Sequence, residues 1–204
     1  SIPFEWSMSG KAQAHLNEGI NQLHENNIMV AIGSLDEALK LDERLWMAHY
    51  YRGVCHKLSG QWKLAEKDFS RTLKLNDQIP VAFLELGKVN QLQMNLQDAE
   101  NNFQKFIKVN PNDVKGYYLM GNLFFQKGEH PKAKKQYEKC NQLNPNFPDS
   151  FVKSGILQIA HERNLTAGIG LFEKALAIDP NHQQALLLHS IALFEKDPTK
   201  SLQD

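Results

Sequence analysis

A glycine recurs every 34 residues along most of this chain, and this period constrains the fold more than any other feature. The glycines are Gly19, Gly53, Gly87, Gly121 and Gly155. A fixed period of this length is typical of repeat architectures, in which neighbouring units bury their apolar faces against each other. The sequence therefore predicts an array of five similar units rather than a single globular core.

Two further columns keep the same register as the glycines. The column of small residues is Ala31, Ala65, Ala99 and Ala133. The apolar or aromatic column is Leu35, Phe69, Phe103, Tyr137 and Phe172. The last interval of the aromatic column is 35 residues long, so one residue has been inserted. We place the insertion in the turn His161–Asn164, because a loop tolerates an extra residue better than a packed helix does.

Within each unit the apolar residues follow two helical stretches of about a dozen residues, which a short polar turn separates. The first four turns are Glu25-Asn26-Asn27, Ser59-Gly60-Gln61, Met94-Asn95 and Lys127-Gly128-Glu129. Gly and Asn suit the left-handed conformation that commonly ends a helix. At the glycine and alanine columns a larger side chain would push the two helices apart, at a cost of roughly 1–3 kcal/mol. The pattern thus predicts closely crossed helix pairs.

A proline also stands near the end of three units, at Pro111, Pro145 and Pro180. A 34-residue period with Gly, Ala, an aromatic residue and Pro at these offsets resembles the tetratricopeptide repeat family from Lys11 to Asn181. The resemblance implies an all-α fold, a right-handed superhelical solenoid of stacked antiparallel helix pairs. We expect five repeats and a C-terminal capping helix, Gln183–Glu195. The predicted parts are an N-terminal extension (1–10), the repeats 11–44, 45–78, 79–112, 113–146 and 147–181, and a capping helix or truncated sixth repeat (182–204).

In the family, the first helix of each pair lines a concave surface. The residues at i, i+4 and i+7 on that side of each first helix form what we call the first-helix stripe. It comprises Leu16, Ile20, Leu23, Tyr50, Val54, Lys57, Leu84, Lys88, Gln91, Tyr118, Asn122, Phe125, Val152, Ile156 and Ile159. All except Leu23, Gln91 and Ile159 are our candidate partner-binding residues. Alternatively, Tyr50 and Tyr118 only pack between repeats, and Lys57 and Lys88 are solvated charges rather than selectors of an acidic partner.

Co-chaperone members of the family hold the C-terminal carboxylate of heat-shock chaperones with a Lys and, one turn later, an Asn. No stretch of this sequence assembles that set. The two columns hold Leu16 with Ile20, Tyr50 with Val54, Leu84 with Lys88, Tyr118 with Asn122 and Val152 with Ile156. We therefore do not expect a carboxylate-clamp co-chaperone.

A polar cluster is expected in the first two repeats, where His15, Glu18, His49, Arg52 and His56 fall in adjacent columns. We interpret it as a structural network built on a Glu18–Arg52 ion pair, since structural zinc usually needs four ligands that include thiolates at short spacing. Protonation of the histidines near pH 6 would then loosen the first two repeats.

The two cysteines, Cys55 and Cys140, stand in columns of small or apolar residues, which predicts buried thiols. No phosphate-binding loop, catalytic triad or paired-carboxylate site is recognisable. We predict no enzyme activity, no cofactor and no metal.

The function that the resemblance implies is a scaffold that binds a peptide or amphipathic helix of another protein. Nucleic acid is not expected as a partner, because 23 Lys and Arg balance 23 Asp and Glu. Membrane insertion is not expected either, because no apolar run approaches the roughly 20 residues that span a bilayer. Two alternatives stay open: a regulatory or substrate-presenting segment of a larger enzyme or secretion or assembly machine, and self-association through the end helices.

The chain starts at Ser1 rather than Met, which indicates a processed or engineered start, so any targeting segment would lie outside this sequence. The compartment stays open, with the cytoplasm slightly favoured. The apolar residues Ile2, Phe4, Trp6 and Met8 are expected to cap the first repeat, to occupy the groove, or to contact a neighbouring domain.

Overall fold

The computed structural model describes residues 4–198, and within this range the chain forms helices and no strands. The helices are α1 Phe4–His24, α2 Ile28–Leu41, α3 Trp46–Leu58, α4 Trp62–Leu75, α5 Pro80–Leu92, α6 Leu96–Val109, α7 Val114–Gln126, α8 His130–Leu143, α9 Pro148–Ala160, α10 Leu165–Ile178 and α11 Gln183–Lys196. They divide into two compact units, residues 1–109 with α1 to α6 and residues 110–204 with α7 to α11.

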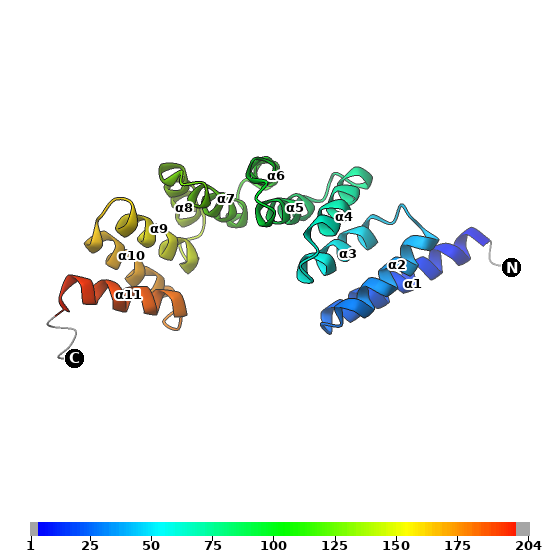
Figure 1. Ribbon diagram of the computed structural model, residues 1–204, viewed down its shortest axis with the longest axis horizontal. Coiled ribbons are helices and arrows are strands. Elements are labelled where there is room, and N and C mark those ends of the chain that lie inside the picture. The colour runs from blue at the N-terminus through cyan, green and yellow to red at the C-terminus, as the bar shows by residue number, and fades with distance from the viewer. Residues whose placement is uncertain (1–3, 199–204) are drawn as a thin grey trace. The chain divides into compact units, whose positions relative to one another are not determined.

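Consecutive helices pack as antiparallel pairs (Figure 1). The first unit holds the pairs α1/α2, α3/α4 and α5/α6, and the second holds α7/α8 and α9/α10, followed by α11. Within a unit, the second helix of one pair also packs against the first helix of the next. The prediction of an all-α fold with five helix pairs and one additional helix is confirmed for the described residues.

The turns inside the pairs lie where the sequence predicted them. Each turn contains one residue with positive φ at an equivalent place: Asn26, Gly60, Met94, Gly128 and Arg163. The first four turns leave three residues between the helices, and the fifth leaves four, His161–Asn164. The inserted residue is therefore in this turn, as expected. Asn164 then begins α10 by accepting a hydrogen bond from the backbone N–H of Ala167 at 3.0 Å.

The glycine column explains how closely the helices of a pair approach each other. A Cβ atom added to Gly87 would lie 2.5 Å from Cε1 of Phe103, and one added to Gly121 would lie 2.6 Å from Cε1 of Tyr137. The other three glycines face the corresponding large side chain of their own second helix in the same way. The structure thus confirms the close crossing and adds the reason for it, since each glycine makes room for the aromatic column.

The two ends of the array differ from the repeats between them. Helix α1 begins at Phe4, inside the segment that we set apart as an N-terminal extension, and runs without interruption to His24. The side chains of Ile2, Phe4 and Trp6 lie outside the described residues. The capping role expected of these side chains therefore stays a prediction.

At the other end, α11 buries Ala185 and Ala192 against the pair before it. Its side chains Leu187, Ile191 and Phe194 are exposed. Within the described residues, no second helix follows to cover them.

Candidate functional site

In the first unit, the first-helix stripe is carried by α1, α3 and α5, and only part of it is exposed. Leu16 and Leu84 are buried in the core. Tyr50 and Val54 are half-buried and pack against the cluster formed by Ala65, Phe69 and Val89 of the following helices. These side chains therefore contribute to packing between repeats and keep part of their surface accessible.

The polar end of this stripe is an ion-pair group that joins α3 to α5. Lys57 donates a hydrogen bond to one oxygen of Glu85, and Lys88 donates to the other oxygen at 3.0 Å. Burial alone would raise the pKa of Glu85, but the two ammonium groups outweigh it and hold this pKa below its usual value. Two cations share one carboxylate, so the group keeps a net positive charge. The sequence pointed to both lysines but not to Glu85.

The tyrosine of this stripe stands beside the ion-pair group. Burial, reinforced by the negative charge of Glu85, raises the pKa of Tyr50 to about 12. The phenol is thus a neutral hydrogen-bond donor over the whole physiological range.

In the second unit, the stripe is carried by α7 and α9 and is mainly apolar. Val152 is buried, and Ile156 packs against the cluster around it. Tyr118 is half-buried and meets Phe147 edge-on, with ring centroids 5.2 Å apart. Phe125 is 37% exposed and stands edge-on to His130 at 5.4 Å. Aromatic rings in this arrangement have a fixed orientation.

The polar residue of this part of the stripe is Asn122. Its side-chain oxygen accepts a hydrogen bond of 2.6 Å from the hydroxyl of Tyr137, which is fully buried in the core of the pair. Burial raises the pKa of Tyr137, so this hydroxyl remains a donor. This hydrogen bond from its own repeat orients the Asn122 side chain.

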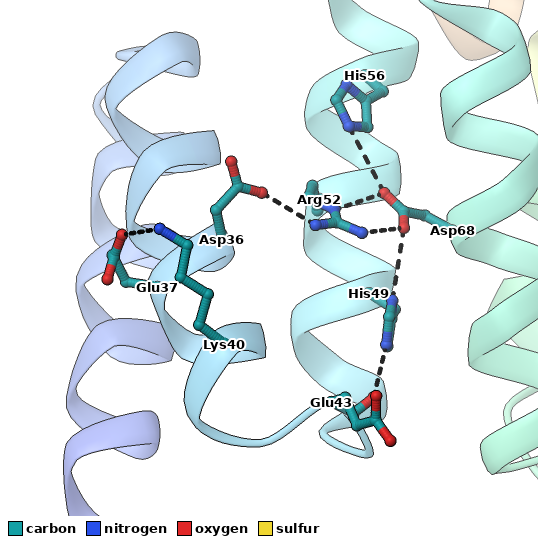
Figure 2. Close-up of polar contacts among 8 residues, drawn as sticks. All are labelled: Asp36, Glu37, Lys40, Glu43, His49, Arg52, His56 and Asp68. Atoms are coloured by element: carbon teal, nitrogen blue, oxygen red, sulfur yellow. Dashed lines mark hydrogen bonds and ion pairs between the residues drawn. The ribbon is translucent and has the colours of Figure 1, made fainter.

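The predicted Glu18–Arg52 ion pair is wrong. Arg52 donates two hydrogen bonds to Asp68 of α4, at 2.9 and 2.8 Å, and one to Asp36 of α2 at 2.9 Å. Glu18 instead accepts from Gln22 on its own helix. Figure 2 shows the Arg52 guanidinium of α3 reaching a carboxylate of the helix on either side. The cluster is structural, as expected, but its carboxylates come from second helices, because these pack against both flanks of α3.

Two of the predicted histidines join this network around Asp68 (Figure 2). Nδ1 of His49 lies 3.5 Å from Asp68, while Nε2 donates to the main-chain oxygen of Glu43 at 2.9 Å. Nε2 of His56 lies 3.6 Å from Asp68, and its buried Nδ1 has no hydrogen-bond partner within the described residues. Burial is the largest influence on His56 and lowers its pKa.

Both cysteines are buried free thiols, as predicted. Burial raises the pKa of Cys55 to about 11 and that of Cys140 to about 12. Since the thiolate is the reactive form, neither group is suited to nucleophilic chemistry at neutral pH.

Within residues 4–198 no group of three or more His, Cys, Asp or Glu side chains is arranged to hold a metal ion. Over the same residues, no helix combines the length and apolar character that crossing a membrane requires.

The helix pairs repeat at 34-residue intervals, and in each pair a glycine of the first helix packs against a large side chain of the second. This arrangement defines a helical repeat protein. The tetratricopeptide repeat pattern matches residues 16–80 and 114–147. These two stretches are therefore tetratricopeptide repeats. Proteins of this class are generally scaffolds for protein–protein interaction rather than enzymes.

Several solved structures share this fold. The crystal structure of YrrB, described as a tetratricopeptide repeat protein with an unusual peptide-binding site, is 24% identical, with a TM-score of 0.69 over 85% of this chain and 89% of YrrB. MamA of Desulfovibrio magneticus RS-1 is 20% identical, with a TM-score of 0.77 over 85% of this chain and 97% of that one. PilF of Pseudomonas aeruginosa is 17% identical, with a TM-score of 0.72 over 95% of both chains. No curated protein matches the sequence.

Proposed function

We propose that this chain holds a peptide or an amphipathic helix of another protein on its first-helix stripe. The observation that carries the proposal is Phe125, an aromatic side chain near the end of α7 that is 37% exposed. A large aromatic group that is partly exposed beside buried apolar neighbours is a usual anchor of protein interfaces, because a partner gains free energy by covering it. The structural likeness to YrrB, which has a peptide-binding site, is in line with this role.

The second unit by itself offers an apolar contact. Tyr118, Phe125 and Ile156 keep accessible surface, whereas Val152 is fully buried and supports them from inside. An apolar strip of this kind suits the apolar face of an amphipathic helix, whose anchors recur at i, i+3 or i+4 and i+7. Val152 is buried beneath this strip and supports it rather than contacts a partner, and Leu16 and Leu84 are likewise buried in the first unit.

The first unit offers a separate, polar contact of its own. The group of Lys57, Glu85 and Lys88 keeps a net positive charge, so it favours carboxylate or carbonyl groups of a bound chain. Because each lysine is already held by Glu85, it loses little further side-chain freedom when a partner binds.

The test uses peptides selected on the intact chain from a displayed random library. Their affinity is then measured by fluorescence anisotropy for Phe125→Ala and for the matched control Trp62→Ala. Trp62 is 38% exposed on the second helix α4, outside the stripe. Truncating an anchor residue costs about 2 kcal/mol, which corresponds to about 30-fold weaker binding. We expect this loss for Phe125→Ala only.

Peptides that bind the Phe125→Ala and Tyr118→Ala variants as tightly as they bind the unmodified chain would show that the stripe is not the site. A circular dichroism spectrum of each variant establishes that the helices are intact, so that a loss of affinity reports on the contact itself.

A further inference from the structure

A pocket outside the first-helix stripe lies between the two helices of the second repeat. It has a volume of about 420 Å³ and is lined by His49 and Arg52 of α3 and by Lys67, Asp68, Ser70, Arg71 and Lys74 of α4. None of these residues belongs to the stripe, and the sequence did not single out the four cations as a set. The pocket lies wholly within the first unit.

The charge of the pocket is strongly positive once the internal pairs are removed. Arg52 is compensated by Asp68 and Asp36, to which it donates all its described hydrogen bonds. Asp68 is the only carboxylate in the lining, and it is also faced by His49 and His56. The lining therefore retains the charges of Lys67, Arg71 and Lys74.

These three cations stand at spacings of four and three residues, so they share one face of α4. Among residues 4–198 none of the three forms a hydrogen bond or an ion pair, whereas most other charged clusters of the chain are paired. Like charges on adjacent turns of a helix repel each other, and an anion bound between them would relieve the repulsion. Since the chain as a whole is neutral, this concentration of unpaired charge is local to the pocket.

We propose that this pocket binds a phosphate group. A phosphate monoester carries a charge of about −1.5 to −2 at neutral pH and three acceptor oxygens, which match three cations better than a single carboxylate does. An arginine fork and a serine hydroxyl are also the donors that phosphate oxygens take most readily. Arg71 and Ser70 offer both from adjacent positions of α4. The volume of the pocket leaves space for the group that carries the phosphate.

The role of the buried network follows from this placement. Arg52 neutralises the charge of Asp68 through two hydrogen bonds. The carboxylate therefore does not repel an anion in the pocket. His49 fixes the same carboxylate and is itself tied to the main chain at Glu43. The lining thus combines a hydrogen-bonded, buried carboxylate with the exposed cations Lys67 and Lys74.

The test is a titration of the ¹⁵N-labelled chain with inorganic phosphate at constant ionic strength, followed by NMR chemical shifts. We expect saturable shifts at Ser70 and Arg71. The variants Arg71→Gln and Lys67→Gln should each bind about tenfold more weakly, since each removes one charge-assisted hydrogen bond. The matched control is Lys108→Gln, which removes an exposed cation of α6 in the same unit but outside the pocket. This control should leave the affinity unchanged.

Two further titrations distinguish the source of the phosphate. A short peptide with phosphoserine that binds more tightly than inorganic phosphate, while its unphosphorylated form does not bind, assigns the pocket to a phosphorylated side chain. Tighter binding of a sugar phosphate than of the phosphopeptide assigns it to a small metabolite. Saturation by acetate at the same concentration as phosphate, equal loss in Lys108→Gln, or the absence of saturable shifts overturns the proposal. None of these results bears on the peptide-binding stripe, whose residues are different.

Discussion

Replacing Gly87 by Ala should destabilise the first unit, although alanine is the better helix former. In an ordinary helix interior this change gains about 1 kcal/mol. Here the new Cβ would meet the ring of Phe103 at 2.5, 2.6 and 3.2 Å, from three of its carbon atoms. Because the ring is fully buried, it cannot swing away. We place the cost at the upper end of the range for overpacking, about 3 kcal/mol, which leaves a net loss of about 2 kcal/mol.

The matched control is Gly33→Ala in the same unit. Gly33 lies inside α2 and is exposed, and a Cβ added to it would have no atom within 4 Å. This variant should therefore gain about 1 kcal/mol. Urea unfolding followed by circular dichroism measures both changes, and the two midpoints should move in opposite directions.

A double-mutant cycle with Phe103→Ala isolates the contact. Once the ring is removed, the clash disappears, so Gly87→Ala should stabilise the chain by about 1 kcal/mol in that background. If Gly87→Ala stabilises the unmodified chain as much as Gly33→Ala does, the glycine column does not set the approach of the two helices, and the packing argument fails.

Two further predictions concern the polar network around Asp68 and the turn His161–Asn164. Burial lowers the pKa of His56 in the folded chain below the unfolded value of 6.5, so the stability that it contributes is present above pH 6.5 and is lost as the pH falls through the folded value. Thermal unfolding between pH 5 and 7.5 should show this loss, and His56→Phe should flatten the curve over that interval. Arg163 adopts φ of 54° where two other turns have glycine, so Arg163→Gly should raise the free energy of unfolding by about 1 kcal/mol, and an unchanged urea midpoint would contradict this.

The sequence was sufficient for the helix pairs, the turns and the inserted residue, because each depends on local properties that the 34-residue period displays directly. The glycines that face a large side chain recur in one column of the repeat. The turn residues with positive φ recur in another. The start of α1 at Phe4 was not predicted, because the period fixes the register of the repeats but not where a helix stops. No proline stands between Phe4 and His24 to end the helix earlier.

The candidate site was harder to predict because it depends on which neighbour covers each side chain. Leu16, Leu84 and Val152 share a column with Tyr50 and Tyr118, yet the three aliphatic residues are buried and the tyrosines are half-exposed. Their larger rings extend beyond the contact with the next repeat. Similarly, the partner of Arg52 could not be chosen from columns on first helices alone, because Asp36 and Asp68 approach it from the second helices.

The contact between each column glycine and the large side chain that it faces joins residues only sixteen or seventeen positions apart in the chain. A pair can therefore form as soon as its own segment has been synthesised, without waiting for distant parts of the polypeptide. Proteins dominated by such short-range contacts fold rapidly, and in repeat arrays folding can nucleate at any pair and propagate to its neighbours. We therefore expect folding of this chain to begin at any of its helix pairs rather than at a single obligatory nucleus.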